Sequence, residues 1–157
     1  SGQSDSHSAW IEQSGSGQDV KIAQLDRDYD TYADPTVIVV VDLDNLKQVN
    51  DGPGGHSAGD HLLRGAAQVM RRCIRDCDFL ARLGGDEFGI TLTSTPADLA
   101  PTLARRVTRA LDLAGIPASV GWSPLAPDRT VRTSVKLADE AMYQAKKRRK
   151  RSAATTG

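Results

Sequence analysis

Four carboxylates stand in two short pairs, and their spacing is the first feature of this sequence that points to chemistry. Asp42 and Asp44 follow the run VIVVV, and Asp86 and Glu87 follow two glycines in RLGGDEF. Neighbouring like charges repel one another, so an Asp-Glu pair at a turn requires solvent, a cation or a chemical role. The positions of the two pairs depend on the elements that carry them.

Apolar periodicity predicts those elements. A run of β-branched apolar residues is typical of a strand buried on both faces, and helical spacing of apolar residues indicates amphipathic helices. A Gly-Gly-Asp link between two apolar segments is a hairpin signal, and a Thr or Ser is expected to cap the last helix. We expect strands at 36–44, 79–83, 88–93 and 116–122, and helices at 60–75, 97–114 and 133–148.

This order of elements predicts an α+β fold, a ferredoxin-like βαββαβ sandwich with an antiparallel-containing central sheet flanked by helices. Its domain is expected to span 36–150. Residues 1–35 begin with a polar, Ser/Gly-rich stretch and are expected to be flexible, and 151–157 are expected to form a disordered tail.

In that topology the first strand lies beside the hairpin at the centre of the sheet, so all four carboxylates should converge. Converging carboxylates raise one another's pKa, and a divalent cation such as Mg²⁺ or Mn²⁺ reverses that penalty. Two such ions about 3.5–4 Å apart activate an attacking hydroxyl and stabilise a leaving pyrophosphate. The arrangement therefore predicts phosphoryl or nucleotidyl transfer. The alternative is that these acids cap turns and face solvent.

Composition narrows the class of protein. The 157 residues suit one globular domain, and their net charge of zero gives no overall electrostatic reason to expect nucleic acid or an anionic membrane as partner. If its lysines have no role in a site, KKRRKR (146–151) is a solvated helix end or, less favoured, a nucleic-acid-binding tail. No apolar run approaches the roughly 18 residues of a membrane span, so we expect a soluble, cytoplasmic chain. Cys73 and Cys77 are expected to be reduced and structural.

Five blocks of the chain, in order within 36–150, resemble the GGDEF domain of bacterial diguanylate cyclases. They are VDLDNLKQVND (41–51), GHSAGDHLL (55–63), RLGGDEF (82–88), SVGW (119–122) and LADEAMYQAKK (137–147). The resemblance implies a fold of the nucleotidyl-cyclase or palm type that condenses two GTP into cyclic di-GMP and releases pyrophosphate. It also implies two Mg²⁺ or Mn²⁺ ions per active site, a transient head-to-head homodimer with one GTP in each domain, and a sensor or partner protein that controls it.

The resemblance also assigns roles to the acids. It gives metal binding to Asp42, to the backbone carbonyl of Leu43 and to Asp86. Asp86 would in addition help to deprotonate the ribose 3′-hydroxyl, and Glu87 is the second acid of the motif. The catalytic set that it implies is therefore Asp42, Asp86 and Glu87.

Substrate binding is carried over in the same way. Asn50 and Asp60 match the positions that read the guanine edge, and an amide and a carboxylate suit the donors and acceptors of that base. Lys150 stands where the family usually has Arg, and a lysine lacks the bidentate fork of a guanidinium. The loop before Gly55 is one residue longer than usual. The full substrate-binding set implied is Leu46 (where Phe is usual), Lys47, Asn50, Asp60, Gly84, Gly85, Lys146 and Lys150.

Arg75 and Asp78 occupy the place of the family's RxxD site, where the product inhibits the enzyme. Arg75 would pair with a phosphate or stack on guanine, and Asp78 would accept from a guanine edge. The alternative is a local salt bridge at a helix end.

The sequence thus predicts a diguanylate cyclase with a product-inhibition site. Two other functions stay open. One is a catalytically poor or inactive domain that serves as a cyclic di-GMP receptor or interaction module, because the family's N-terminal signature is absent from 1–35. The other is a relative that makes a different cyclic nucleotide, against which Asp60 argues.

Overall fold

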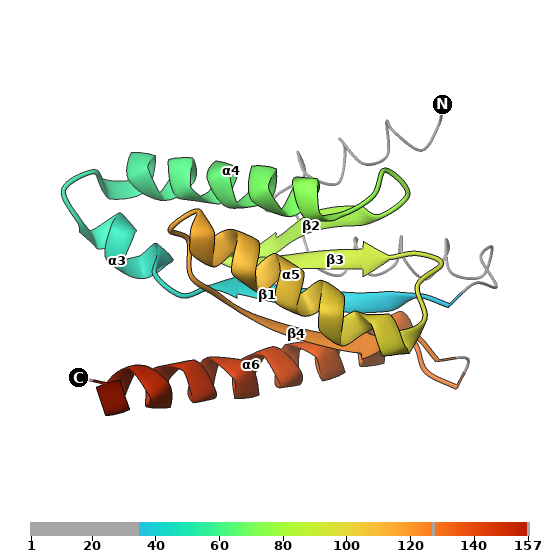
Figure 1. Ribbon diagram of the computed structural model, residues 1–157. Coiled ribbons are helices and arrows are strands. Elements are labelled where there is room, and N and C mark those ends of the chain that lie inside the picture. The colour runs from blue at the N-terminus through green and yellow to red at the C-terminus, as the bar shows by residue number, and fades with distance from the viewer. Residues whose placement is uncertain (1–34, 127, 157) are drawn as a thin grey trace.

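The computed structural model describes residues 35–126 and 128–156, and the predicted flexible segment 1–35 lies almost wholly outside them. Within the described residues the fold alternates strands and helices (Figure 1). In chain order the elements are β1 (Val37–Leu43), α3 (Leu46–Asp51), α4 (Gly55–Cys73), β2 (Phe79–Gly84), β3 (Glu87–Leu92), a 3₁₀ turn (Ala97–Leu99), α5 (Ala100–Leu113), β4 (Ala118–Pro124) and α6 (Val131–Thr156).

The four strands form one sheet in the order β2-β3-β1-β4, and every neighbouring pair is antiparallel. The helices α4 and α5 cover one face of this sheet and α6 crosses the other (Figure 1). With α4 and α5 as the two crossovers, the chain has the βαββαβ order. The predicted ferredoxin-like α+β sandwich is therefore confirmed.

The central strand β1 separates two cores. All seven of its residues are buried, as its unbroken apolar run predicted. Successive side chains of a strand point to opposite faces, so Val37, Val39 and Val41 pack on the side of α4 and α5. Ile38 and Val40 pack against the apolar face of α6. The same alternation carries past the apolar run to the acidic end of the strand.

Two features of the helices before the hairpin differ from the sequence expectation. The short helix α3 was not predicted, and α4 begins at Gly55 instead of Asp60. The segment that adds this first turn, GHSAG, has no apolar periodicity, so pattern alone begins the helix too late. Its turns are stabilised by the packing of α3 against α4.

The last helix is longer than expected at both ends. It begins at Val131, where the hydroxyl of Thr130 accepts a hydrogen bond from the amide of Thr133 at 3.1 Å, so the capping residue precedes the predicted Thr133 or Ser134. It ends at Thr156, so the expectation of a disordered tail over 151–157 is not met for 151–156. The basic run contains no helix breaker, and cations are favoured near a helix C-terminus.

Candidate active site

The end of β1 and the tip of the β2-β3 hairpin lie next to each other, as the topology predicted. Asp42 is directly opposite Glu87 in the antiparallel register. The amide of Leu43 donates to the backbone carbonyl of Asp86 at 2.9 Å, which fixes the tip against the strand end. Directly opposite residues project from the same face of a sheet, so the side chains of Asp42 and Glu87 share the face covered by α6.

The two glycines are exposed at the end of this hairpin, Gly84 as the last residue of β2 and Gly85 as the first of the turn. Gly85 has a φ of 49°, in the left-handed region that glycine adopts without strain. Its carbonyl accepts a hydrogen bond from Nε of Arg82 at 2.9 Å. The turn therefore presents bare backbone beside Asp86.

Asp42 is held by a lysine from the far end of the chain. Nζ of Lys146 donates to Oδ2 of Asp42 at 2.7 Å, while Oδ1 is buried without a hydrogen-bond partner. Burial raises the pKa of Asp42, the hydrogen bond from Lys146 opposes that rise, and the charge of Asp86 adds to it. Burial lowers the pKa of Lys146, but its contacts with Asp42 outweigh burial and the net pKa is raised. The pair therefore stabilises the charged form of Lys146, whereas Asp42 is only partly neutralised.

Asp42, Asp86 and Glu87 form an acidic cluster, in which Glu87 has the most strongly shifted pKa. Its pKa is raised from 4.5 to about 8 by burial, by a hydrogen bond with Asp139 of α6 and by the charges of Asp139, Asp42 and Asp86. Carboxylates that face one another without a cation keep a proton in this way. In the metal-free protein the cluster therefore carries less negative charge than its composition suggests.

The prediction that four carboxylates converge holds for three of them. Asp44 takes a different set of partners: Oδ1 accepts from the hydroxyl of Ser119 at 2.9 Å, and Oδ2 pairs with Nε of Arg149 at 3.3 Å. A second nitrogen of Arg149 pairs with Asp112 at the end of α5, at 2.9 Å. Asp44 therefore ties β1 to β4, α5 and α6, and leaves the acidic cluster to the other three.

Sequence reasoning missed Asp139, Arg149, Asp112 and Ser119. A signal existed for two of them, because the buried stripe of α6 continues at helical spacing through Asp139, Met142, Lys146 and Arg149. The stripe changes from apolar to charged where the helix passes the acidic end of β1. Lys150, predicted to contact phosphate, is exposed, and Arg149 is the residue directed at Asp44.

The residues around Asp42 fit a divalent cation. Oδ1 of Asp42 is buried and unpartnered, and Asp86 lies near enough to raise the pKa of Asp42 by its charge and by a hydrogen bond. Among the described residues no three Asp, Glu, His or Cys side chains form a cluster that could hold a metal, so the protein would supply only part of a coordination shell. Mg²⁺ is commonly bound by one or two carboxylates together with water and substrate phosphates.

The predicted guanine-reading residues lie on α3 and α4. Asn50 is half-buried near the end of α3, and Asp60 is exposed on α4. The side chain of Asn50 lies so close to Gly59 that a Cβ at that position would be 1.7 Å from its Oδ1. On α3, Lys47 is exposed and Leu46 belongs to the core on the α4 and α5 side. The structure thus places an amide next to the helical turn that carries Asp60.

Arg75 and Asp78 form a compact unit at the end of α4. Both oxygens of Asp78 accept from the Arg75 guanidinium, at 3.1 and 3.2 Å, and the amides of Arg75 and Thr93 donate to them at 2.8 and 3.0 Å. The side chain of Asp78 is 1% exposed and that of Arg75 54%. Asp78 therefore orients the arginine from within the fold, and only Arg75 is presented to a ligand.

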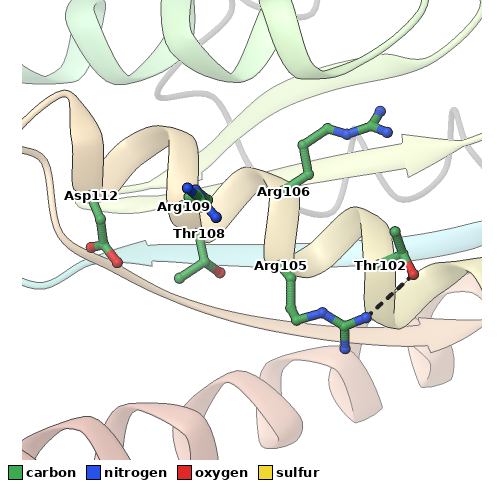
Figure 2. A pocket seen from close by; sticks show the side chains of 6 residues that line it. All are labelled: Thr102, Arg105, Arg106, Thr108, Arg109 and Asp112. Carbon is green, nitrogen blue, oxygen red and sulfur yellow. Dashed lines mark hydrogen bonds between the residues drawn. The ribbon is translucent and has the colours of Figure 1, made fainter.

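A separate hollow of about 480 Å³ lies on the surface of α5 (Figure 2), lined by Thr102, Arg105, Arg106, Thr108, Arg109 and Asp112. Figure 2 shows Arg106 extending toward α4 and Arg105 extending toward α6, and the guanidinium of Arg105 donates to the Thr102 hydroxyl at 3.4 Å. None of the predicted site residues lines it. Asp112 connects it through Arg149 to Asp44, which lies outside the acidic cluster.

Comparison with known proteins agrees with this geometry. The family model described as "Diguanylate cyclase, GGDEF domain" matches residues 19–152. The chain belongs to the GGDEF family. The described site is accordingly the GGDEF hairpin of that family, with Asp86 and Glu87 at its tip.

Among curated proteins, the chain is 34% identical over 119 residues to the probable diguanylate cyclase DgcC of Escherichia coli K12, a match that covers 70% of the chain and 32% of that protein. The chain therefore spans about a third of the length of that GGDEF relative.

Among solved structures, the active GGEEF domain of a diguanylate cyclase from Vibrio cholerae superposes with a TM-score of 0.69 at 28% identity, over 80% of this chain and 85% of that one. A microbial GGDEF domain, solved to describe its interaction with cyclic di-GMP, superposes with a TM-score of 0.62 at 29% identity, over 82% and 81%. None of the described helices of the present chain is both long and apolar enough to cross a membrane.

Proposed function

We propose that this GGDEF domain is a diguanylate cyclase that condenses two GTP into cyclic di-GMP and releases pyrophosphate. The observation that carries the proposal is the meeting of Asp42 and Asp86 beside the glycine turn, with Oδ1 of Asp42 buried and unpartnered. A buried carboxylate oxygen without a donor is costly, and a cation offsets that cost. The curated relatives named diguanylate cyclases support the same activity.

Asp42, the carbonyl of Leu43 and Asp86 would hold the Mg²⁺ or Mn²⁺ ions, two per active site. When bound, such ions polarise the α-phosphate and lower the pKa of the attacking 3′-hydroxyl. Asp86 would accept the proton of that hydroxyl. Glu87, across from Asp42, has its pKa raised to about 8 in the metal-free chain. It would lose its proton as positive charge enters the cluster.

The other contacts divide between the base and the phosphates. Asn50 and Asp60 would read guanine from neighbouring turns of α3 and α4. Gly84 and Gly85 would let the turn backbone lie along the phosphates, which Lys47 and Lys146 would neutralise. Arg149 would keep α6 in place through Asp44 and Asp112.

The reaction joins two nucleotides, and each domain would hold one. Two copies must therefore face each other so that the 3′-hydroxyl of one GTP lies in line with the α-phosphate of the other. The proposal includes a transient homodimer, brought together by a sensor or partner protein in the longer proteins that carry this domain.

The product, cyclic di-GMP, would bind at the surface around Arg75. The exposed guanidinium suits a phosphate or a guanine face, and Asp78 holds it in position. Product inhibition is therefore part of the proposal.

The experiment that tests the activity compares the chain with two single variants. The purified protein at high concentration is incubated with GTP and Mg²⁺, and the nucleotides are separated with mass detection. The chain should yield cyclic di-GMP, and Asp86→Asn should abolish it. Asp98→Asn, an exposed acid in the 3₁₀ turn before α5, should not change the yield.

The absence of product from the unmodified chain at every protein concentration would overturn the cyclase proposal. If cyclic di-GMP then still bound in calorimetry, and Arg75→Ala removed that binding, the chain would be a receptor. A product of different mass from mixtures of GTP and ATP would point to a different cyclic nucleotide.

A further inference from the structure

Lys146 forms an ion pair with Asp42, the same carboxylate that would bind the proposed metal. Its ammonium lies 2.7 Å from Oδ2 of Asp42, and the two side chains are 23% and 11% exposed. The other oxygen of Asp42 is buried and without a partner. A hydrogen bond between two ionised and largely buried groups is stronger than a surface salt bridge.

The pair and a bound cation are in competition. A divalent cation between Asp42 and Asp86 would lie within a few ångströms of the ammonium, and like charges at such separations repel strongly in a partly buried site. The unpartnered Oδ1 of Asp42 would face the ion while Oδ2 stays beside the ammonium, so one carboxylate would lie between two cationic groups. Repulsion between the two positive charges would therefore push the Lys146 ammonium away from Asp42.

The structure provides for movement of the side chain alone. One turn further along α6, Arg149 is fixed to Asp44 and Asp112, so the helix is anchored beside the lysine. The lysine side chain has a flexible four-carbon stem with a compact charge, and it can swing without shifting the helix. The nearest new anion would be the phosphates of a nucleotide at the glycine turn.

From these contacts we infer that Lys146 is an internal counter-ion that releases Asp42 when a divalent cation binds and then pairs with the phosphates of the nucleotide. This inference rests on the proposed function for the nucleotide and on the Asp42 site for the metal. It makes the binding of metal and nucleotide cooperative, because each removes an obstacle to the other. Lys146 is thus a positioning residue that lowers the affinity for metal in the absence of substrate.

The test measures metal binding without nucleotide. In calorimetry with Mn²⁺, Lys146→Met should bind the ion on the order of tenfold more tightly than the unmodified chain, since a charged hydrogen bond no longer competes. With saturating Mn²⁺ and a GTP analogue that has a methylene bridge between the α- and β-phosphorus, the same variant should bind the nucleotide about tenfold more weakly. A higher affinity for Mn²⁺ together with a lower affinity for the nucleotide is the result that the exchange predicts.

The controls separate this role from a merely structural one. Lys147→Met removes a charge from the next residue of α6, whose ammonium lies 4.7 Å from the ring centre of Tyr143, and should change neither affinity. Lys146→Arg keeps the charge and should keep the weaker affinity for Mn²⁺. Asp42→Asn should abolish Mn²⁺ binding. Where Lys146→Met does not fold, Lys146→Gln takes its place in the same measurement.

An unchanged or weaker affinity of Lys146→Met for Mn²⁺, with the nucleotide affinity reduced, would make Lys146 a phosphate ligand only and overturn the inference. The cyclase assay on the unmodified chain keeps the two proposals apart. If the unmodified chain makes cyclic di-GMP and Lys146→Met has an unchanged affinity for Mn²⁺, only the counter-ion role is contradicted. If Lys146→Met binds Mn²⁺ more tightly but the unmodified chain makes no cyclic di-GMP, only the proposed activity is contradicted.

Discussion

The side chain of Asn50 fills the space that a side chain at Gly59 would need: a Cβ there would lie 1.7 Å from Oδ1 and 2.8 Å from Cγ of the asparagine. Gly59 is buried within α4, and Asn50 reaches it from α3. The glycine thus determines where the amide proposed to read guanine lies, next to Asp60.

Gly59→Ala is predicted to weaken GTP binding while leaving the fold intact. The atoms in the way belong to the free end of one side chain, so Asn50 should turn aside while α4 stays in place. Replacing glycine by alanine within a helix also favours the helix by up to about 1 kcal/mol. The expected result is an unchanged or higher melting temperature together with a KM for GTP raised about tenfold, from the loss of one or two hydrogen bonds.

Gly65→Ala is the matched control, because it lies in the same helix and its Cβ would meet only Cδ1 of Ile116 at 3.6 Å. It should gain the same helix propensity without changing KM. A Gly59→Ala variant with unaltered KM would show that the position of Asn50 does not govern nucleotide binding.

The stability of the metal-free protein is predicted to fall as the pH rises through the range in which Glu87 ionises. Its pKa is about 8 in the folded chain and 4.5 is its ordinary value, so folding takes up a proton between these limits. The free energy of unfolding should therefore be largest below pH 4.5 as far as this group is concerned, decrease up to about pH 8 and then level off. Asp42 has a pKa raised in the same direction and adds to the slope.

Denaturant unfolding at about pH 5.5 and about pH 8.5 without divalent cations measures this difference. Glu87→Gln should reduce it, and so should Asp139→Asn, which removes the facing carboxylate. Glu140→Gln, an exposed acid next to Asp139, should leave it unchanged. Equal pH dependence in Glu87→Gln and the unmodified chain would contradict the raised pKa. Added Mg²⁺ should reduce the loss at high pH.

Gly121→Ala is predicted to destabilise the protein. A Cβ on Gly121 of β4 would lie 2.1 Å from the amide nitrogen of Met142 and 2.3 Å from the carbonyl oxygen of Ala138. These are backbone atoms of α6 that cannot turn aside, so the helix would have to move away from the sheet. Overpacking of this kind costs about 1–3 kcal/mol.

Denaturant unfolding gives the loss, with Gly65→Ala again as the control. Because α6 carries Lys146 and Arg149, cyclic di-GMP synthesis in the folded fraction of Gly121→Ala should fall as well. Full synthesis by a stable Gly121→Ala protein would show that α6 tolerates displacement.

Asp78→Ala is predicted to cost far more stability than Arg75→Ala. Asp78 is buried and accepts from two backbone amides, so its removal leaves those donors unsatisfied at about 1–3 kcal/mol each. Arg75 is half-exposed, and its pair with Asp78 and its hydrogen bonds to the Thr93 carbonyl and the Thr95 hydroxyl are each worth about 1 kcal/mol or less. The midpoints of denaturant unfolding compare the two, and equal losses would contradict the structural role of Asp78.

Arg75→Ala is consequently the variant with which to test the product site. Cyclic di-GMP should inhibit it at least about tenfold more weakly than the unmodified chain, because a charge-assisted contact is lost. Inhibition at unchanged product concentration would place the inhibitory site elsewhere.

The course of the strands followed from local patterns. The run VIVVV is typical of a strand buried on both faces, so β1 was predictable. The pair Gly84-Gly85 between two apolar segments is typical of a turn, so the hairpin was predictable as well. The short helix α3 and the first turn of α4 were not, because their stability comes from packing against each other and leaves no apolar period in the sequence.

By itself, the sequence determined the βαββαβ order of elements, the meeting of Asp42 with Asp86 and Glu87, and the family, because these depend on short segments with strong local signals. Only the tertiary structure decided which cation faces which acid. Lys146 pairs with Asp42 and Arg149 with Asp44, each across most of the described chain, and the acid Asp139 faces Glu87. Such pairs depend on the angle and register at which α6 crosses the sheet, and these are set by the packing of its buried stripe and by the close approach at Gly121.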